Sequence, residues 1–430
     1  MDRRHFLALP LLAVWAATGM SFAQVQANAP AIKVGVIEGF SGSFAYAGEG
    51  VYRNLLLVTE QINAAGGVLL GGEPHRMEIE RFDSQGVVQN ALSMLKAAID
   101  QGVRIIVQGN SSAIAAALIG AIEKHNARNP DKRVVFLNYS AVETSLTNEA
   151  CSFWHFRFDA SADMRLTALF EVLRQDKNIT KVYLVGQDYS FGRYVVKRSR
   201  EMIAQIRPDI EIVGEVLHPP GHVKDFIPYA TKIKHSGAQA IVTGNWGNDL
   251  SLLIRATHDV GLDASFYTFY ANDFGAPAAI GQAGIGKAMA VNEWHPNVGV
   301  ALGGDAQKAS DAFYYTFHKR FPNPQDEFIR LRIHVMMSML AQALNQADVL
   351  DAEKIAYALE GMKFENGFHH ATMRAEDHQL QQPLNVATMD RLGVPGVVFD
   401  NEGSGYGFRN VLRLEAEKIE LPQFCAMKRP

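Results

Sequence analysis

The sequence lacks the features that would mark a disulfide scaffold, a nucleic-acid binder or an integral membrane protein. Two cysteines in 430 residues exclude a fold held together mainly by disulfides. The 41 Lys and Arg residues nearly balance 45 Asp and Glu residues, which gives no support for binding nucleic acid or an anionic membrane surface. Beyond residue 23, no apolar run is long and uncharged enough to span a bilayer. With 48% hydrophobic and 20% charged residues, the chain has a globular composition, and its length favours two domains.

The first 23 residues have the three parts of a signal peptide. Arg3 and Arg4 give a positive start, residues 6–20 are apolar, and residues 21–23 have the small-x-small form of a cleavage site ending at Ala23. Because the apolar run is shorter than the roughly 20 residues that span a bilayer, a cleaved signal is favoured over a permanent anchor. We expect an exported protein, located in the periplasm of a bacterium with two membranes. The paired arginines leave both the Sec and the twin-arginine route open.

Cys151 and Cys425 can pair in such an oxidising compartment. Their bond would enclose almost the whole exported chain, and the chain-entropy model gives such a loop at most about 5 kcal/mol of stabilisation. Two buried free thiols are the alternative.

The pattern of apolar residues predicts a doubly wound α/β fold, because short β-rich runs alternate with longer helical ones. The first series of expected strands is 32–38, 77–82, 104–108, 133–138 and 153–158, with helices at 48–65, 87–101 and 113–125. The second series, from residue 161, has strands at 182–186, 210–216, 240–243, 266–270 and 288–293. Helices are expected again at 305–321, 327–346 and 352–360, followed by short strands at 368–373, 384–389, 397–399 and 411–414. This order of strands and helices predicts two similar α/β lobes.

Several motifs point away from cofactors, metals and catalysis. Residues 281–287 fit the spacing of a phosphate-binding loop, but Ala288 stands where the Mg²⁺-binding hydroxyl belongs. No G-x-S-x-G elbow supports a hydrolase. His369, His370 and His378 lack the spacing of a metal site and are expected as exposed hairpin residues. We expect no cofactor, no metal and no enzymatic activity.

Polar loops follow three expected strands of the first lobe, where ligands bind in open α/β sheets. They span residues 39–46, 109–112 and 138–141. Hydroxyls and backbone N–H groups beside a helix N-terminus favour a carboxylate, although Ser and Asn are also common helix caps. The candidate ligand-binding residues of this lobe are Tyr46, Asn110, Ser111, Ser112, Ser140 and Ala141.

The second lobe offers aromatic and acidic residues at the corresponding strand ends, in loops 187–192, 243–247 and 269–273. Aromatic rings could hold the apolar body of a ligand, and a nearby carboxylate could pair with an ammonium. Simple packing between the lobes is the alternative for the aromatic residues. The candidates are Phe191, Asn245, Trp246, Tyr270 and Asp273.

The sequence resembles the type I periplasmic binding proteins of ABC importers, in the Leu/Ile/Val-binding (hydrophobic amino acid) group. The resemblance rests on Ile32-Lys33-Val34-Gly35 followed by Ser41-Gly42, on Ile62-Asn63-Ala64-Ala65-Gly66-Gly67-Val68, and on Asp188 with Phe191-Gly192. It extends over residues 32–430.

This resemblance implies two Rossmann-like lobes joined by three hinge crossings, with the ligand enclosed in the cleft between them. Lobe one would comprise 31–160 plus about 292–365, and lobe two 161–291 plus about 366–430. The family's carboxylate-binding role carries over to Ser111, Ser112, Ser140 and Ala141. Asp273 becomes the candidate for an ammonium, with Tyr270 or Trp246 alongside. Phe191 replaces a common Tyr, and Asn245-Trp246 is bulkier and less charged than an ammonium site needs, so an amino-free carboxylate is a second possibility.

The predicted function is therefore that of a non-enzymatic periplasmic solute-binding protein. It would capture a branched-chain or other hydrophobic amino acid, or an aromatic or aliphatic carboxylate, and deliver it to the permease of an ABC importer in the inner membrane. The alternative is a ligand-sensing domain with the same fold and site that docks on a receptor.

Overall fold

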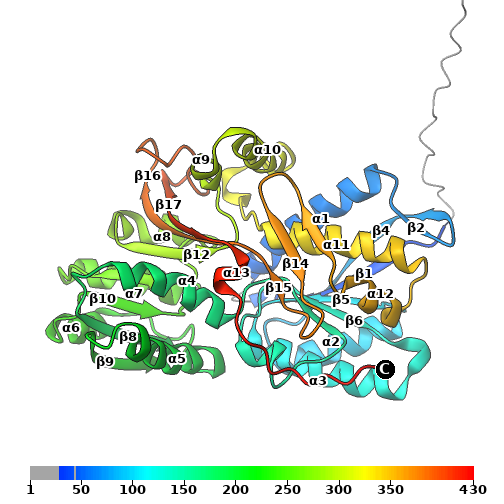
Figure 1. Ribbon diagram of the computed structural model, residues 1–430, viewed down its shortest axis with the longest axis horizontal. Coiled ribbons are helices and arrows are strands. Elements are labelled where there is room, and N and C mark those ends of the chain that lie inside the picture. Colours follow the sequence, from blue (N-terminus) through cyan, green and yellow to red (C-terminus); the bar gives the residue numbers. More distant parts are fainter. Residues whose placement is uncertain (1–28, 43–44) are drawn as a thin grey trace, which may run out of the picture.

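The computed structural model describes residues 29–42 and 45–430, so the predicted signal peptide and two residues of the first polar loop lie outside it. Lobe one, on the right in Figure 1, contains a parallel five-stranded sheet. Its strands, in spatial order, are β4 (Met77–Asp83), β1 (Ile32–Glu38), β5 (Ile105–Gln108), β6 (Val135–Asn138) and β7 (His155–Arg157). Most residues of the central strands are apolar and buried, as expected for a parallel sheet covered on both faces.

Helices from two parts of the chain cover this sheet. They are α1 (Ala45–Ala64), α2 (Val88–Asp100), α3 (Ser112–Arg128), α9 (Val298–Leu302), α10 (Gly304–Arg320), α11 (Leu331–Ala347) and α12 (Ala352–Leu359). A small hairpin of β2 (Val68–Leu70) and β3 (Glu73–His75) follows α1. Apolar residues of α11 and α12 pack in the same core cluster as the strands.

Lobe two contains a seven-stranded mixed sheet. Its order is β17 (Tyr406–Leu414), β16 (Leu384–Arg391), β12 (Ala288–Asn292), β11 (Ser265–Thr268), β10 (Ala240–Thr243), β8 (Lys181–Gln187) and β9 (Glu211–His218). The strands from β12 to β9 run parallel, whereas β16 and β17 add an antiparallel edge.

Six helices belong to lobe two in the described chain. They are α4 (Ala162–Gln175), α5 (Ser190–Ile206), α6 (Ile227–His235), α7 (Asn248–Asp259), α8 (Ala276–Ile280) and α13 (Ala416–Ile419). Ser161 caps α4, because its hydroxyl accepts the Met164 N–H at 3.2 Å. The first helix of lobe two therefore starts immediately after the chain leaves lobe one.

The chain crosses between the two cores near residues 158–160, 291–294 and 380–384. Buried charges join these crossings. Asp159 accepts a hydrogen bond from Arg165 at 2.6 Å and lies 3.4 Å from Arg332, which donates to Glu293 at 2.8 Å. The side chain of Asn385 donates to the Glu293 carbonyl at 3.0 Å. Although burial opposes ionisation, Arg332 lowers the pKa of Glu293 to about 2, so the network is charged.

The third crossing differs in position from the division made on the sequence, which assigned residues 366–430 to lobe two. A three-stranded antiparallel sheet of β13 (Lys363–Glu365), β14 (His370–Met373) and β15 (Leu380–Gln381) precedes it. Met373 and Leu380 are buried in the core of lobe one. Residues 366–381 therefore pack with lobe one, and the antiparallel edge of lobe two starts at β16.

The C-terminal tail passes back to lobe one after α13, as the red segment in Figure 1 shows. Ile419 is buried in the core of lobe two. Cys425 forms a disulfide with Cys151 of lobe one, which confirms the predicted pairing, and the Phe424 N–H donates to the Asn148 side chain at 2.9 Å. The tail is thus a fourth, covalently anchored connection between the lobes.

Two predicted elements are wrong in detail. Residues 397–399 form no strand, because the Asn297 side chain takes their backbone groups: it accepts from Val398 and Phe399 and donates to the Phe399 carbonyl, each at 2.8 Å. The helix expected from residue 327 begins at Leu331. The Asn54 amide donates to the carbonyl of Phe328 and accepts the Arg330 N–H at 2.9 Å, which holds this segment extended.

The prediction of exposed hairpin histidines holds only for His370. His369 and His378 are buried, and burial lowers the pKa of His369 to about 4. His378 stacks on Phe156 with ring centroids 3.9 Å apart, and its Nε2 lies 2.7 Å from Glu360. These imidazoles are packing groups of lobe one.

Across residues 29–42 and 45–430, we find no helix with both the length and the apolar character needed to traverse a bilayer.

Candidate ligand-binding site

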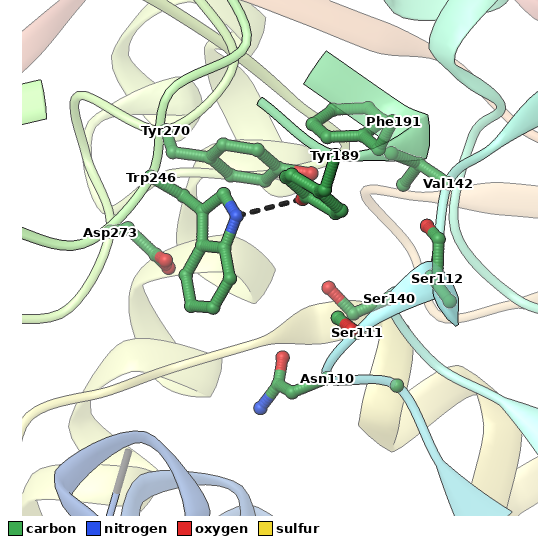
Figure 2. A pocket seen from close by; sticks show the side chains of 12 residues that line it. Asn110, Ser111, Ser112, Ser140, Val142, Tyr189, Phe191, Trp246, Tyr270 and Asp273 are labelled. Atoms are coloured by element: carbon green, nitrogen blue, oxygen red, sulfur yellow. Dashed lines mark hydrogen bonds between the residues drawn. The ribbon is translucent and has the colours of Figure 1, made fainter. Parts of the chain in front are cut away.

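A cavity lies between the lobes, at the ends of the parallel strands. Figure 2 shows small polar side chains on one side and aromatic rings on the other. The lining residues are Gly109, Asn110, Ser111, Ser112, Ser140, Ala141 and Val142 from lobe one, and Tyr189, Phe191, Trp246, Tyr270 and Asp273 from lobe two.

The N-termini of two long helices meet at this cavity. Ser111 is the N-cap residue of α3, and Tyr189 is the N-cap residue of α5; each helix has 17 residues. In the described chain, neither side chain accepts a capping hydrogen bond from its helix. The first turns of both helices carry partial positive charge, so the pair favours an anionic ligand group between them.

The loop after β6 supplies the remaining polar side of lobe one. The Asn138 side chain accepts the N–H groups of Ser140 at 3.0 Å and Ala141 at 2.7 Å, which fixes a tight turn. The Ser140 hydroxyl accepts a hydrogen bond from Arg332 at 3.4 Å. Ser140 thus connects the pocket directly to the buried charges of the hinge.

The aromatic residues of lobe two form one contiguous surface. The Trp246 indole N–H donates to the Tyr189 hydroxyl at 2.9 Å, drawn as the dashed line in Figure 2. Phe191 lies with its ring centroid 6.0 Å from that of Tyr189 and 6.4 Å from that of Tyr270. Burial raises the pKa of Tyr189 and of Tyr270, so both phenols stay protonated and can donate to a ligand.

Asp273 lines the pocket, but its carboxylate forms an ion pair with Arg330 of lobe one. Arg330 belongs to the extended segment before α11, and its guanidinium also lies 4.2 Å from the centre of the Phe328 ring. The acidic group expected to receive an ammonium therefore already has a cationic partner.

The structure brings together all the predicted ligand-binding residues except Tyr46 and Asn245. Tyr46 stacks on Phe274 across the cleft, with ring centroids 5.7 Å apart, and lines a neighbouring cavity instead. Asn245 is buried, and its amide contacts His218 Nε2 at 2.8 Å. Neither side chain lines the cavity between the lobes, and their role in binding stays a prediction.

The residue-based prediction missed Gly109, Val142 and Tyr189 as lining residues. Gly109 and Tyr189 lie in loops that were singled out, but no chemical feature of Gly or of a single Tyr identified them. Val142 directly follows the 138–141 loop. It lies in the cleft because the chain continues from there toward the first crossing between the lobes. Among the described residues, no group of three His, Cys, Asp or Glu is arranged to hold a metal ion.

Comparison with known proteins agrees with this architecture. A family model described as "periplasmic binding protein" matches residues 31–393. The "Leu/Ile/Val-binding protein homolog 4" of Brucella melitensis biotype 1 is 31% identical over 416 residues, and the match covers 94% of each chain.

Two solved structures show the same fold. The leucine-, isoleucine-, valine-, threonine- and alanine-binding protein from Brucella ovis, in a closed conformation, matches with a TM-score of 0.80 and 28% identity, over 94% of this chain and 100% of that chain. The solute-binding protein of an ABC transporter from Rhodopseudomonas palustris BisB5, in complex with 3,4-dihydroxybenzoic acid, matches with a TM-score of 0.74 and 17% identity, over 90% and 98% of the two chains.

Two α/β lobes joined by three crossings, with a polar and aromatic pocket between them, define a solute-binding protein. The chain belongs to the periplasmic binding protein family, in its type I fold. The periplasm is accordingly its compartment.

Proposed function

We propose that this protein captures a small carboxylate with an apolar body between its lobes and delivers it to the permease of an ABC importer. The supporting observation is that the pocket has a polar side in lobe one and an aromatic side in lobe two. Two helix N-termini and three serines face the aromatic surface of lobe two across the cavity. Such a site suits one anionic end and one apolar end of a single ligand. The names of the relatives, which bind branched-chain amino acids or an aromatic acid, fit both ends.

Contacts across the cleft explain how ligand capture could be signalled to a permease. The Ser190 hydroxyl of lobe two donates to the Glu143 carboxylate of lobe one at 2.8 Å, and Asp273 pairs with Arg330. These contacts require the lobes to be close together. A ligand held by both lobes would favour the closed arrangement, and a permease that recognises both lobes would distinguish it from the open one.

Export and the absence of catalysis belong to the same proposal. Residues 1–23 would be removed on export, and the pocket would release its ligand chemically unchanged. Incubation of a bound ligand with the purified protein, followed by mass spectrometry, should return the ligand intact. A new product would contradict the non-enzymatic role.

A thermal-shift and calorimetry panel tests the proposed ligand class. The panel pairs L-leucine with 4-methyl-2-oxopentanoate and L-phenylalanine with phenylpyruvate, and adds 4-hydroxybenzoate. Because a ligand that binds only the folded protein raises its melting temperature by mass action, at least one of these acids should do so in a concentration-dependent way. The proposal would be contradicted if none of them shifts the melting temperature at concentrations up to about 10 mM.

The Asp273→Asn variant separates the two kinds of ligand. If an amino acid binds through its ammonium, the variant should weaken it by tenfold or more, about 1.4 kcal/mol, while the amino-free analogue keeps its affinity within about threefold. Because Arg330 already pairs with Asp273, we expect the amino-free acids to be the tighter ligands. Tighter binding of the amino acid in each pair would reverse that ranking and leave the import role intact.

A further inference from the structure

One buried carboxyl group joins two of the polar loops of lobe one, 109–112 and 138–141. Glu38 is the last residue of β1 and has no exposed surface. Its Oε1 accepts the N–H groups of Gly109 at 2.8 Å and Asn110 at 3.1 Å, from the loop after β5. The same oxygen accepts the Tyr139 hydroxyl at 2.6 Å, from the loop after β6. Asn110 lines the pocket, and Ser140, the neighbour of Tyr139, lines it as well.

Glu38 accepts hydrogen bonds through one oxygen but has no cationic partner in the described chain. In the described chain it forms no ion pair, and its Oε2 is buried without a hydrogen-bond partner. A buried acid with no cation beside it is costly to ionise. Burial accordingly raises the pKa of Glu38 to about 7, although its hydrogen bonds to Tyr139 and to the backbone act in the opposite direction.

The ionisable groups around Glu38 do not neutralise it. On the neighbouring strand β4, Asp83 uses its carboxylate to accept Phe40 N–H and the Ser41 hydroxyl at 2.9 and 2.6 Å. Tyr139 carries no charge, because burial and the proximity of Glu38 raise the pKa of its phenol well above the ordinary value. Arg332, whose charge acts to lower the pKa of Tyr139, is itself paired with Glu293 and Asp159.

A ligand carboxylate on the lobe-one loops would add a second negative charge close to Glu38, since Asn110 contacts both the pocket and Glu38. Two carboxylates at neighbouring positions favour protonation of the one with the poorer partners. Resting on the function proposed above, we propose that Glu38 is a positioning residue of the two binding loops and takes up a proton when a carboxylate ligand binds. Capture is then tighter at mildly acidic pH.

The direction follows from linkage. A ligand whose binding raises the proton affinity of a group binds more tightly at pH values below the group's titration range in the free protein. Between pH 8.5 and pH 6.0 the ligand carboxylate itself stays ionised. The dissociation constant should therefore rise by about threefold to tenfold from pH 6.0 to pH 8.5.

Calorimetry on the mature protein tests this directly. The probes are L-leucine, 4-methyl-2-oxopentanoate and 4-hydroxybenzoate, and binding of any one of them is sufficient. Titrations at pH 7 in buffers of different ionisation enthalpy give the number of protons exchanged, and we expect uptake of about half a proton. In Glu38→Gln, which keeps the shape of the side chain, uptake and the pH dependence of the dissociation constant should disappear.

Glu402→Gln is the matched control. Burial raises the pKa of Glu402 to about 7 as well, but this side chain accepts the Gly275 N–H and touches neither of the two loops. The control should keep the proton uptake of the unmodified protein. Loss of uptake in Glu402→Gln, or its persistence in Glu38→Gln, would overturn the inference.

The remaining outcomes are also decisive. Binding without proton exchange would overturn the inference and leave the proposed function standing, whereas no binding of any probe would contradict the proposed function and the inference that rests on it. If Glu38→Gln does not fold, Tyr139→Phe replaces it. Loss of this donor should move the pH at which affinity declines upward, because the carboxylate is less stabilised. An unchanged pH profile in that variant would equally reject the role of Glu38.

Discussion

The two lobes contribute different kinds of side chain to the pocket. Lobe one contributes small side chains whose positions are fixed by backbone hydrogen bonds, as at Ser140 and Ala141, which share the Asn138 oxygen. Lobe two contributes large rings fixed mainly by one another, as in the Trp246–Tyr189 contact. Lobe one can therefore recognise a charged group of constant shape, whereas lobe two sets which apolar body fits beside it.

This difference teaches where ligand specificity resides. A carboxylate is the same in every ligand of the proposed class, and a site of short side chains at a helix N-terminus needs little adjustment. The apolar bodies of the ligands differ in size and shape. Replacing one aromatic side chain of the pocket by another changes the size of the cavity by about as much as these ligands differ from one another. We expect substitutions in lobe one to weaken all ligands alike and substitutions in lobe two to change their ranking.

The largest expected effect comes from breaking the disulfide that attaches the C-terminal tail to lobe one. Replacing Cys151 and Cys425 together by Ser should lower the free energy of unfolding by up to about 5 kcal/mol, since the bond spans 274 residues of sequence. Urea denaturation with and without reductant measures this. Because neither cysteine lines the pocket, ligand affinity should change little. Equal stability of the variant and the unmodified protein would show that the bond does not restrict the unfolded chain.

The next effect should come from the aromatic side. Trp246→Ala removes a large ring from the pocket and leaves the Tyr189 hydroxyl without its indole donor. We expect ligand affinity to fall by about 3 kcal/mol, more than a hundredfold, as measured by calorimetry. Tyr46→Ala is the control, because Tyr46 is exposed at the neighbouring cavity, and it should change affinity by less than about 0.5 kcal/mol. Equal losses in both variants would remove the distinction between the two cavities.

The smallest effect should come from single hydroxyls on the polar side. Ser112→Ala and Ser140→Ala should each weaken every binding acid by about 1–2 kcal/mol, because each removes one hydrogen-bonding group from a buried site. Ser93→Ala on the exposed face of α2 serves as control. Unchanged affinity in both pocket variants would refute the assignment of the carboxylate to lobe one. A change in ligand ranking would refute the division of tasks between the lobes.

Much of this site could be predicted because of one geometric rule. In a parallel sheet the carboxyl ends of the strands meet at one edge, so loops at 109–112 and 138–141, far apart in sequence, had to lie together. The same rule placed Phe191, Trp246 and Tyr270 on one side of lobe two. Strand positions were predictable since buried parallel strands are nearly continuous apolar runs.

What could not be predicted depends on contacts between distant segments. Asn245 and Trp246 are adjacent, and only the twist of their loop decides which of them faces the cleft. Arg330, the partner of Asp273, comes from the segment after the second crossing, and no local pattern joins the two. The extended path of residues 397–399 depends on one side chain, Asn297, about a hundred residues away.

The buried charged residues that connect the crossings are distinct from the residues that line the pocket. Asp159 and Glu293 belong to the crossings, Arg165 of α4 pairs with Asp159, and none of the three lines the pocket. Substitutions in the pocket loops can therefore change the ligand while the residues of the crossings stay the same. The contact from Arg332 to Ser140, at 3.4 Å, is where the two sets of residues meet. A bacterium that keeps the crossings unchanged could therefore alter which nutrient the protein binds by a few point mutations in the pocket loops.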